Sequence, residues 1–146
     1  MSVELPFAPV DSIVRRNAGG LRVGSGATEA LTERIQRRGA ERAVRAAEAA
    51  TADGRKTLMP ADFGVETVPD SDALELPIAP VDRIARLDID DRYRVAMDAR
   101  IALASLLEDE ADTVAEVAAR LARHAGRRTV KRPDVELYDE LQPHFG

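Results

Sequence analysis

The sequence predicts an all-α protein made of two tandem copies of one unit, in which a short helix, a long helix and a second short helix follow one another. Three observations lead to this prediction. The chain has 146 residues, enough for one ordinary domain or two very small ones. Alanine occurs 25 times while aromatic residues make up only 3%, a composition that favours close helix packing over a sheet core. The third observation is an internal repeat.

Two pairs of matching segments establish this repeat. Residues 4–15 read ELPFAPVDSIVR and residues 75–86 read ELPIAPVDRIAR, with nine of twelve positions identical at an offset of 71. Residues 54–63 (GRKTLMPADF) correspond to residues 126–135 (GRRTVKRPDV) at an offset of 72. The chain is therefore a tandem duplication of one small unit.

A short linker separates the copies. Residues 67–74 are polar and turn-forming, and Pro69 cannot continue a helix. We therefore predict one unit over residues 1–66, the linker over 67–74, and a second unit over residues 75–146.

Each copy is expected to begin with a short amphipathic helix. Pro9 and Pro80 suit a first helical turn, and the apolar spacing after each predicts about three turns. Residues 17–20 should end this helix in the first copy, and residues 88–91 should end it in the second.

A short extended segment and a long helix come next in each copy. The extended segments are residues 21–23 and 93–95, each with one arginine between apolar neighbours. Stretches without proline then predict long helices over residues 27–52 and 98–125.

Each long helix should stop at a glycine, Gly54 or Gly126, after which Pro60 and Pro133 each open a third, short helix. A helix of about 26 residues is about 39 Å long and has nothing of matching length to pack against within its own copy. We therefore expect the two copies to pack against each other.

Composition excludes several kinds of site. Because the chain has no cysteine, it has no disulfide, thiolate zinc site or thiol nucleophile, and its only histidines are His124 and His144. No paired carboxylates, nucleophile–base set or glycine-rich phosphate loop stands out. We expect neither an enzyme nor a cofactor, a metal or a small-molecule substrate.

Charge and hydropathy indicate a cytoplasmic, soluble protein without membrane contact. The first residues show no secretion signal, and no run of eighteen apolar residues occurs. The net charge of −5 argues against a polyanionic partner. However, 19 of the 21 basic residues are arginines and several gather in particular loops, so the acid excess is interpreted as adaptation to a salt-rich, halophilic cytoplasm.

The second copy resembles an archaeal histone. The resemblance is carried by ELPIAPVDRI at residues 75–84, DARIALASLLEDEAD at 98–112 and ARLARHAGRRTVKRPDVELY at 119–138. The first copy keeps ELPxAPV and GRKT, so residues 4–145 as a whole are similar to a tandem (doublet) archaeal histone. The resemblance implies two histone folds joined in an intramolecular handshake pseudodimer, associated with the nucleoid or chromosome, that binds and bends double-stranded DNA.

The resemblance also implies which residues contact DNA. If the long helices cross antiparallel, the first loop of each copy lies beside the second loop of the other. In the family, the arginine of the first loop enters the minor groove and the Arg-Lys-Thr turn holds phosphates, without base-specific contacts. Arginines of the first helices and backbone N–H groups at their N-termini add phosphate contacts. The expected DNA-binding residues are Arg15, Arg22, Arg55, Lys56, Thr57, Arg83, Arg86, Arg94, Arg127, Arg128, Thr129 and Lys131.

Two structural ion pairs are implied as well. Arg55 with Asp62, and Arg127 with Asp134, match a family pair that clamps the second loop. This role is structural rather than catalytic, because no nucleophile or base stands beside either pair.

The resemblance further implies a contact between dimers. Its residues in the second copy are Leu121, His124, Asp134 and Leu137. The first copy has Ala49, Ala52, Asp62 and Val65 at the matching positions. We therefore expect two chains to associate through the second histone fold.

Two questions stay open at this point. The arginine run Arg34, Arg37, Arg38, Arg42 and Arg45 is interpreted either as charge complementary to a crossing helix or as a solvated face, with an extra DNA contact as a third interpretation. The alternative function is a histone-fold protein-interaction module acting in transcription regulation with weak or no DNA binding. The net acidic charge favours that alternative, and the loop arginines favour DNA binding.

Overall fold

A computed structural model describes residues 3–145, so the outermost residues of the two expected units, 1–2 and 146, lie outside the described part. The elements in chain order are α1 (Phe7–Asn17), β1 (Arg22–Val23), α2 (Ser25–Ala52), β2 (Thr57–Leu58), the 3-10 turn η1 (Pro60–Phe63), η2 (Ser71–Ala73), α3 (Ile78–Ala85), β3 (Arg94–Val95), α4 (Met97–His124), β4 (Thr129–Val130), α5 (Arg132–Leu141) and η3 (Gln142–His144). The long helices begin one or two residues earlier than expected, and each has 28 residues.

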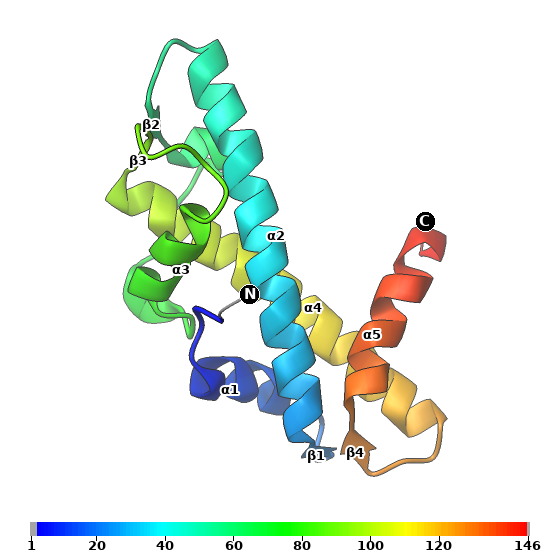
Figure 1. Ribbon diagram of the computed structural model, residues 1–146. Coiled ribbons are helices and arrows are strands. Elements are labelled where there is room, and N and C mark those ends of the chain that lie inside the picture. Colours follow the sequence, from blue (N-terminus) through cyan, green and yellow to red (C-terminus); the bar gives the residue numbers. More distant parts are fainter. Residues whose placement is uncertain (1–2, 146) are drawn as a thin grey trace.

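The two long helices cross near their middles (Figure 1). Gly39 of α2 lies near this crossing, where a Cβ atom would stand 2.7 Å from a methyl group of Ile84 and 3.0 Å from one of Leu107. A glycine inside a helix normally costs stability, and here it allows close approach of α3 and α4. α1 packs on α4 and α3 packs on α2, so each short first helix lies against the long helix of the other half.

One hydrophobic core is therefore shared by both halves of the chain. It contains Ile13 and Leu31 from the first half and Ile84, Leu103 and Leu107 from the second, all almost fully buried. Many alanines along α2 and α4 are buried in the same core, as the composition indicated.

The repeated ELP segments have a clear structural role. The Glu4 N–H donates to Oε1 of Gln36 on α2 at 2.8 Å. In the second half, the N–H groups of Glu75 and Leu76 donate to Oε1 of Glu108 on α4 at 2.7 and 2.9 Å. Each segment is thus anchored through its backbone to a long helix, which explains why both copies keep it.

The prediction of a third helix in the first copy is wrong. Pro60 opens only the four-residue turn η1, which ends at Gly64 in the left-handed conformation with φ +77°. The chain then runs into the linker with Pro69, whereas Pro133 in the second copy opens the ten-residue α5. A glycine in this conformation ends a helix, so the first copy has no counterpart of α5.

The first helix of the second copy is also shorter than expected. It ends at Ala85 rather than at residues 88–91 and has eight residues, fewer than three turns. Acidic residues are unfavourable at the negative C-terminal end of a helix, and this segment carries Asp88, Asp90 and Asp91.

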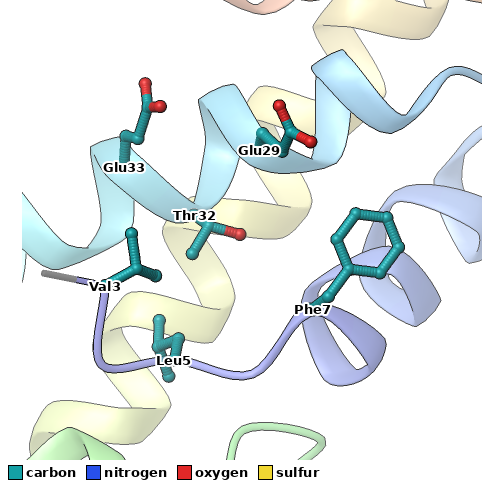
Figure 2. Close-up of a pocket in the computed structure, with 6 residues that line it drawn as sticks. All are labelled: Val3, Leu5, Phe7, Glu29, Thr32 and Glu33. Atoms are coloured by element: carbon teal, nitrogen blue, oxygen red, sulfur yellow. The ribbon is translucent and has the colours of Figure 1, made fainter.

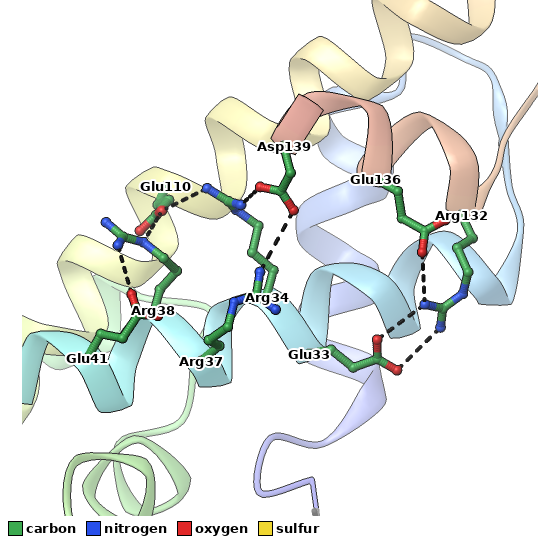
Figure 3. Close-up of polar contacts among 9 residues, drawn as sticks. All are labelled: Glu33, Arg34, Arg37, Arg38, Glu41, Glu110, Arg132, Glu136 and Asp139. Atoms are coloured by element: carbon green, nitrogen blue, oxygen red, sulfur yellow. Dashed lines mark hydrogen bonds and ion pairs between the residues drawn. The ribbon is translucent and has the colours of Figure 1, made fainter. Parts of the chain in front are cut away.

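The arginine run on α2 meets carboxylates from the other half of the chain (Figure 3). Glu110 of α4 lies 3.2 Å from Arg34, 2.8 Å from Arg38 and 3.7 Å from Arg42. Arg34 also pairs with Asp139 of α5. For these three arginines, the interpretation as charge complementary to a crossing helix is the one that the structure supports.

Candidate nucleic-acid interface

Two short parallel strand pairs bring loops of the two halves together at opposite ends of the molecule (Figure 1). At the first end, β1 pairs with β4, so that Arg22 stands opposite Thr129. The Arg22 N–H donates to the Arg128 carbonyl, and the Gly24 N–H donates to the Val130 carbonyl, each at 2.9 Å. We call this place the β1–β4 end.

The β2–β3 end is built in the same way. Arg94 stands opposite Thr57, its N–H donates to the Lys56 carbonyl at 2.9 Å, and the Ala96 N–H donates to the Leu58 carbonyl at 3.1 Å. The structure thus brings each first-loop arginine beside the second loop of the other half, as the antiparallel crossing requires.

Five of the expected DNA-binding side chains are exposed and form no ion pair with any residue between 3 and 145. They are Arg22, Lys56, Arg94, Arg128 and Lys131. A cation without an intramolecular partner loses no salt bridge when it binds a phosphate group, so these side chains are the ones best suited to contact a polyanion.

The second loop is clamped at both ends of the molecule. Arg55 donates to both carboxylate oxygens of Asp62, at 2.8 and 2.9 Å, and to the Thr57 carbonyl at 2.8 Å. Only 4% of the Asp62 side chain is exposed. The hydrogen bond from Arg55 lowers the Asp62 pKa and raises that of Arg55, so both groups stay charged. Arg55 thus fixes the turn.

The β1–β4 end repeats this clamp. Arg127 donates to both oxygens of Asp134 and to the Thr129 carbonyl, and the Lys131 N–H donates to Asp134 at 2.8 Å. Burial works to raise the Asp134 pKa, but the hydrogen bonds from Arg127 and Lys131 outweigh it and lower that pKa. The carbonyls rather than the hydroxyls of Thr57 and Thr129 therefore have identified partners in the turns.

The arginines of the short helices are less free. Nε of Arg15 lies 2.6 Å from Asp11, and Nε of Arg86 lies 3.1 Å from Asp82. Arg83 is 54% exposed and lies 3.9 Å from Glu4. No side chain caps the N-terminus of α1 or α3, so the first-turn N–H groups there are without side-chain acceptors.

Sequence reasoning missed Arg123, on the last turn of α4. Its Nη2 donates to the Ala18 carbonyl at 2.9 Å, which ties the end of α4 to the loop before Arg22. A Cβ atom on Gly19, whose φ is +58°, would stand 2.1 Å from that nitrogen. The two residues meet only because α1 and α4 cross, so no local pattern could have identified the contact.

The residues expected to join two dimers are only partly exposed. His124 is exposed and Leu121 and Leu137 are half-buried, whereas Asp134 is buried in the clamp and does not belong to the exposed face. Leu121 and His124 line an open groove of about 550 Å³. The groove residues that the sequence did not single out are Val117, Arg120, Arg123, Leu141 and Phe145.

A second hollow lies between the N-terminal segment and α2 (Figure 2). Val3, Leu5 and Phe7 face the part of α2 that carries Glu29 and Glu33. The hollow has a volume of about 270 Å³, and this lining offers no nucleophile paired with a base among residues 3–145. No helix in the same range is both long and apolar enough to cross a bilayer.

Three comparisons with known proteins agree. The family described as histone-like transcription factor (CBF/NF-Y) and archaeal histone matches residues 74–137. The archaeal histone HAN1 of Thermococcus zilligii is 52% identical over 63 residues, which cover 43% of this chain and 91% of that protein. The crystal structure of the histone from Methanopyrus kandleri superposes with a TM-score of 0.68 at 27% identity, covering 90% of this chain and 91% of that chain. The family match falls on the second half, and the structural match extends over both halves.

Proposed function

Since this chain belongs to the archaeal histone family, we propose that it binds double-stranded DNA on the chromosome, without enzymatic activity, through phosphate and minor-groove contacts that are largely independent of sequence. The observation that carries the proposal is the equivalent placement of Arg22 and Arg94. Both are exposed, lack an ion pair among residues 3–145, and stand beside a clamped turn that carries another free cation. Such an arrangement favours backbone contact and bending of DNA over base readout.

We propose further that the two halves, residues 1–66 and 75–146, are two histone folds forming a pseudodimer within one chain, with residues 67–74 as the linker. The shared core and the crossing of α2 with α4 support this arrangement. The match to the Methanopyrus kandleri histone, in which one chain aligns with both halves, supports it as well.

Two chains are proposed to associate through their second halves. Leu121, His124 and Leu137 remain accessible there, whereas the first half has alanines and no counterpart of α5. Replacing Leu121 and His124 with alanine should abolish a two-chain particle on DNA and leave the helical content unchanged. Sedimentation of the DNA-bound protein measures this, and particles that lengthen continuously with added protein would contradict the proposal.

DNA binding is tested with the double variant Arg22→Ala/Arg94→Ala. Losing two phosphate contacts should reduce the slope of log affinity against log salt by about 1.8. At about 1 kcal/mol for each exposed contact, affinity should fall roughly thirtyfold. The matched control is Arg37→Ala/Arg45→Ala, which removes the same charge from exposed positions on α2 and should change the affinity less than threefold.

A second candidate function is supported by the net charge of −5 and by the transcription factors that share the matched family. In this alternative the chain recruits proteins in transcription and binds DNA weakly. Affinity at low salt that does not differ between the Arg22→Ala/Arg94→Ala variant and the unsubstituted chain would favour this alternative.

A further inference from the structure

We infer that this chain holds DNA mainly at its β1–β4 end, and that carboxylates in the loop between α3 and α4 weaken the contact at the β2–β3 end. The inference rests on the proposed DNA binding and adds which of the two equivalent sites dominates. Its basis is a difference in charge between the two ends that the tandem repeat does not itself require.

The β1–β4 end is purely cationic. It is formed by residues 18–24, between α1 and α2, and residues 125–131, between α4 and α5. These segments contain four cationic side chains and no carboxylate, and the cations are Arg22, Arg127, Arg128 and Lys131. Three of the four form no ion pair with any residue between 3 and 145, because only Arg127 is engaged by Asp134.

The β2–β3 end has nearly balanced charge. It is formed by residues 53–59 and residues 86–96. These segments contain five cations, Arg55, Lys56, Arg86, Arg92 and Arg94, and four carboxylates, Asp53, Asp88, Asp90 and Asp91. All four carboxylates are exposed, so they face the same solvent that a DNA backbone would occupy.

Several cations at the β2–β3 end are partly neutralised by these groups. Nε of Arg55 lies 3.0 Å from Asp53, and Nε of Arg92 lies 3.9 Å from Asp90, whose Oδ1 also accepts from the Arg92 N–H at 2.9 Å. Asp91 precedes Arg94 by three residues, a backbone span of at most about 10 Å. The acidic segment therefore lies within about one Debye length of the arginine at 0.1 M salt, close enough to repel an approaching phosphate.

The connections between the halves differ at the two ends in the same sense. At the β1–β4 end the cation Arg123 reaches from α4 to the Ala18 carbonyl. At the β2–β3 end the matching position, 72 residues earlier, is the neutral Thr51, whose hydroxyl pairs with that of Tyr93. The end of α4 thus adds positive charge beside Arg22, and the end of α2 adds none beside Arg94.

A consequence follows for the proposed association of two chains. Leu121 and His124 lie on the last turns of α4, near the β1–β4 end. Two chains joined there place their cationic ends at the centre of the particle and their acidic loops at its outer limits. DNA is then held in the middle and released at each outer end, so the particle does not extend along the DNA.

The single variants Arg22→Ala and Arg94→Ala test the inference, with short duplex DNA at low salt as the ligand. Arg22→Ala should weaken binding at least tenfold and Arg94→Ala less than threefold, because the second contact is already weak. Equal losses, with binding by the unsubstituted chain intact, would overturn the one-sided contact alone. If the unsubstituted chain does not bind DNA at low salt, the proposed function fails together with the inference.

The acidic loop is tested by the triple variant Asp88→Asn/Asp90→Asn/Asp91→Asn. Its affinity should rise about tenfold and its footprint should lengthen by about one helical turn, roughly 10 base pairs. The control Glu48→Gln/Glu116→Gln/Glu140→Gln removes the same charge from exposed positions outside both ends. An equal gain in that control would show that net charge alone is responsible, and would overturn the role assigned to the loop.

Discussion

Replacing Glu110 with glutamine should destabilise the fold far more than replacing an exposed carboxylate beside it. Glu110 is the carboxylate that three arginines of α2 share, and it links the long helices of the two halves. Glutamine keeps the shape and one hydrogen-bond acceptor but removes the charge, leaving three guanidinium groups close together with no common counter-ion.

The size of the effect follows from burial. The Glu110 side chain is 16% exposed, Arg34 is 11% exposed, and Arg38 and Arg42 are 27% and 29% exposed. Breaking a fully buried ion pair costs about 3–5 kcal/mol, and an exposed pair contributes at most about 1 kcal/mol. This partly buried cluster should lie between, at about 2 kcal/mol, which lowers the Tm of a chain of this length by about 4–8 °C.

The assay is urea unfolding followed by circular dichroism, with Asp109→Asn as the matched control. Asp109 is the adjacent residue, is exposed, and loses the same charge, so this variant should change the free energy of unfolding by less than about 0.5 kcal/mol. If Glu110→Gln and Asp109→Asn unfold at the same urea concentration, the cluster is a solvated charge pattern and the reasoning is refuted.

Three further predictions concern the crossing, the clamps and the dependence of one half on the other. Gly39→Val should lower the free energy of unfolding by about 2 kcal/mol in urea denaturation, because its side chain would overlap the Ile84 methyl group. The pKa values of Asp62 and Asp134 are lowered in the fold, so their stabilisation is complete above their ordinary pKa of 3.8 and is lost as pH falls below it; acid unfolding monitored by circular dichroism should become shallower in the Asp62→Asn variant. Residues 1–66 expressed alone should be unfolded or self-associated in sedimentation, and a stable monomer would contradict the shared core.

The sequence predicts most of the fold because its strongest signals are local or periodic. Gly54 and Gly126, both with positive φ, end the long helices as expected, and the repeat correctly indicates that both halves use the same loops. The failure at Pro60 has a physical reason. A proline starts a helix equally well in α and 3-10 form, and the residues after it decide which one continues. There, Gly64 stops the first copy after one turn.

The candidate site was predictable only as far as chain position determines it. The pairing of Arg22 with the second loop of the other half follows from the crossing of two long helices, and it could be stated without coordinates. The engagement of Arg127 and the freedom of Arg128 depend on which side chain reaches Asp134, and that depends on tertiary packing. Adjacent arginines with the same charge therefore have different roles.

The differences between the two halves are concentrated at one end of the molecule. The absent third helix, the alanines in place of Leu121 and His124, and the acidic loop at residues 88–91 all lie toward the β2–β3 end. In a dimer of two identical chains the two ends would be equal by symmetry, and a substitution at one would appear at both. Joining the halves in one chain removes this constraint. One end can then keep every contact for DNA and a second chain, while the other accumulates charge and loses surface without preventing folding, because the core is shared.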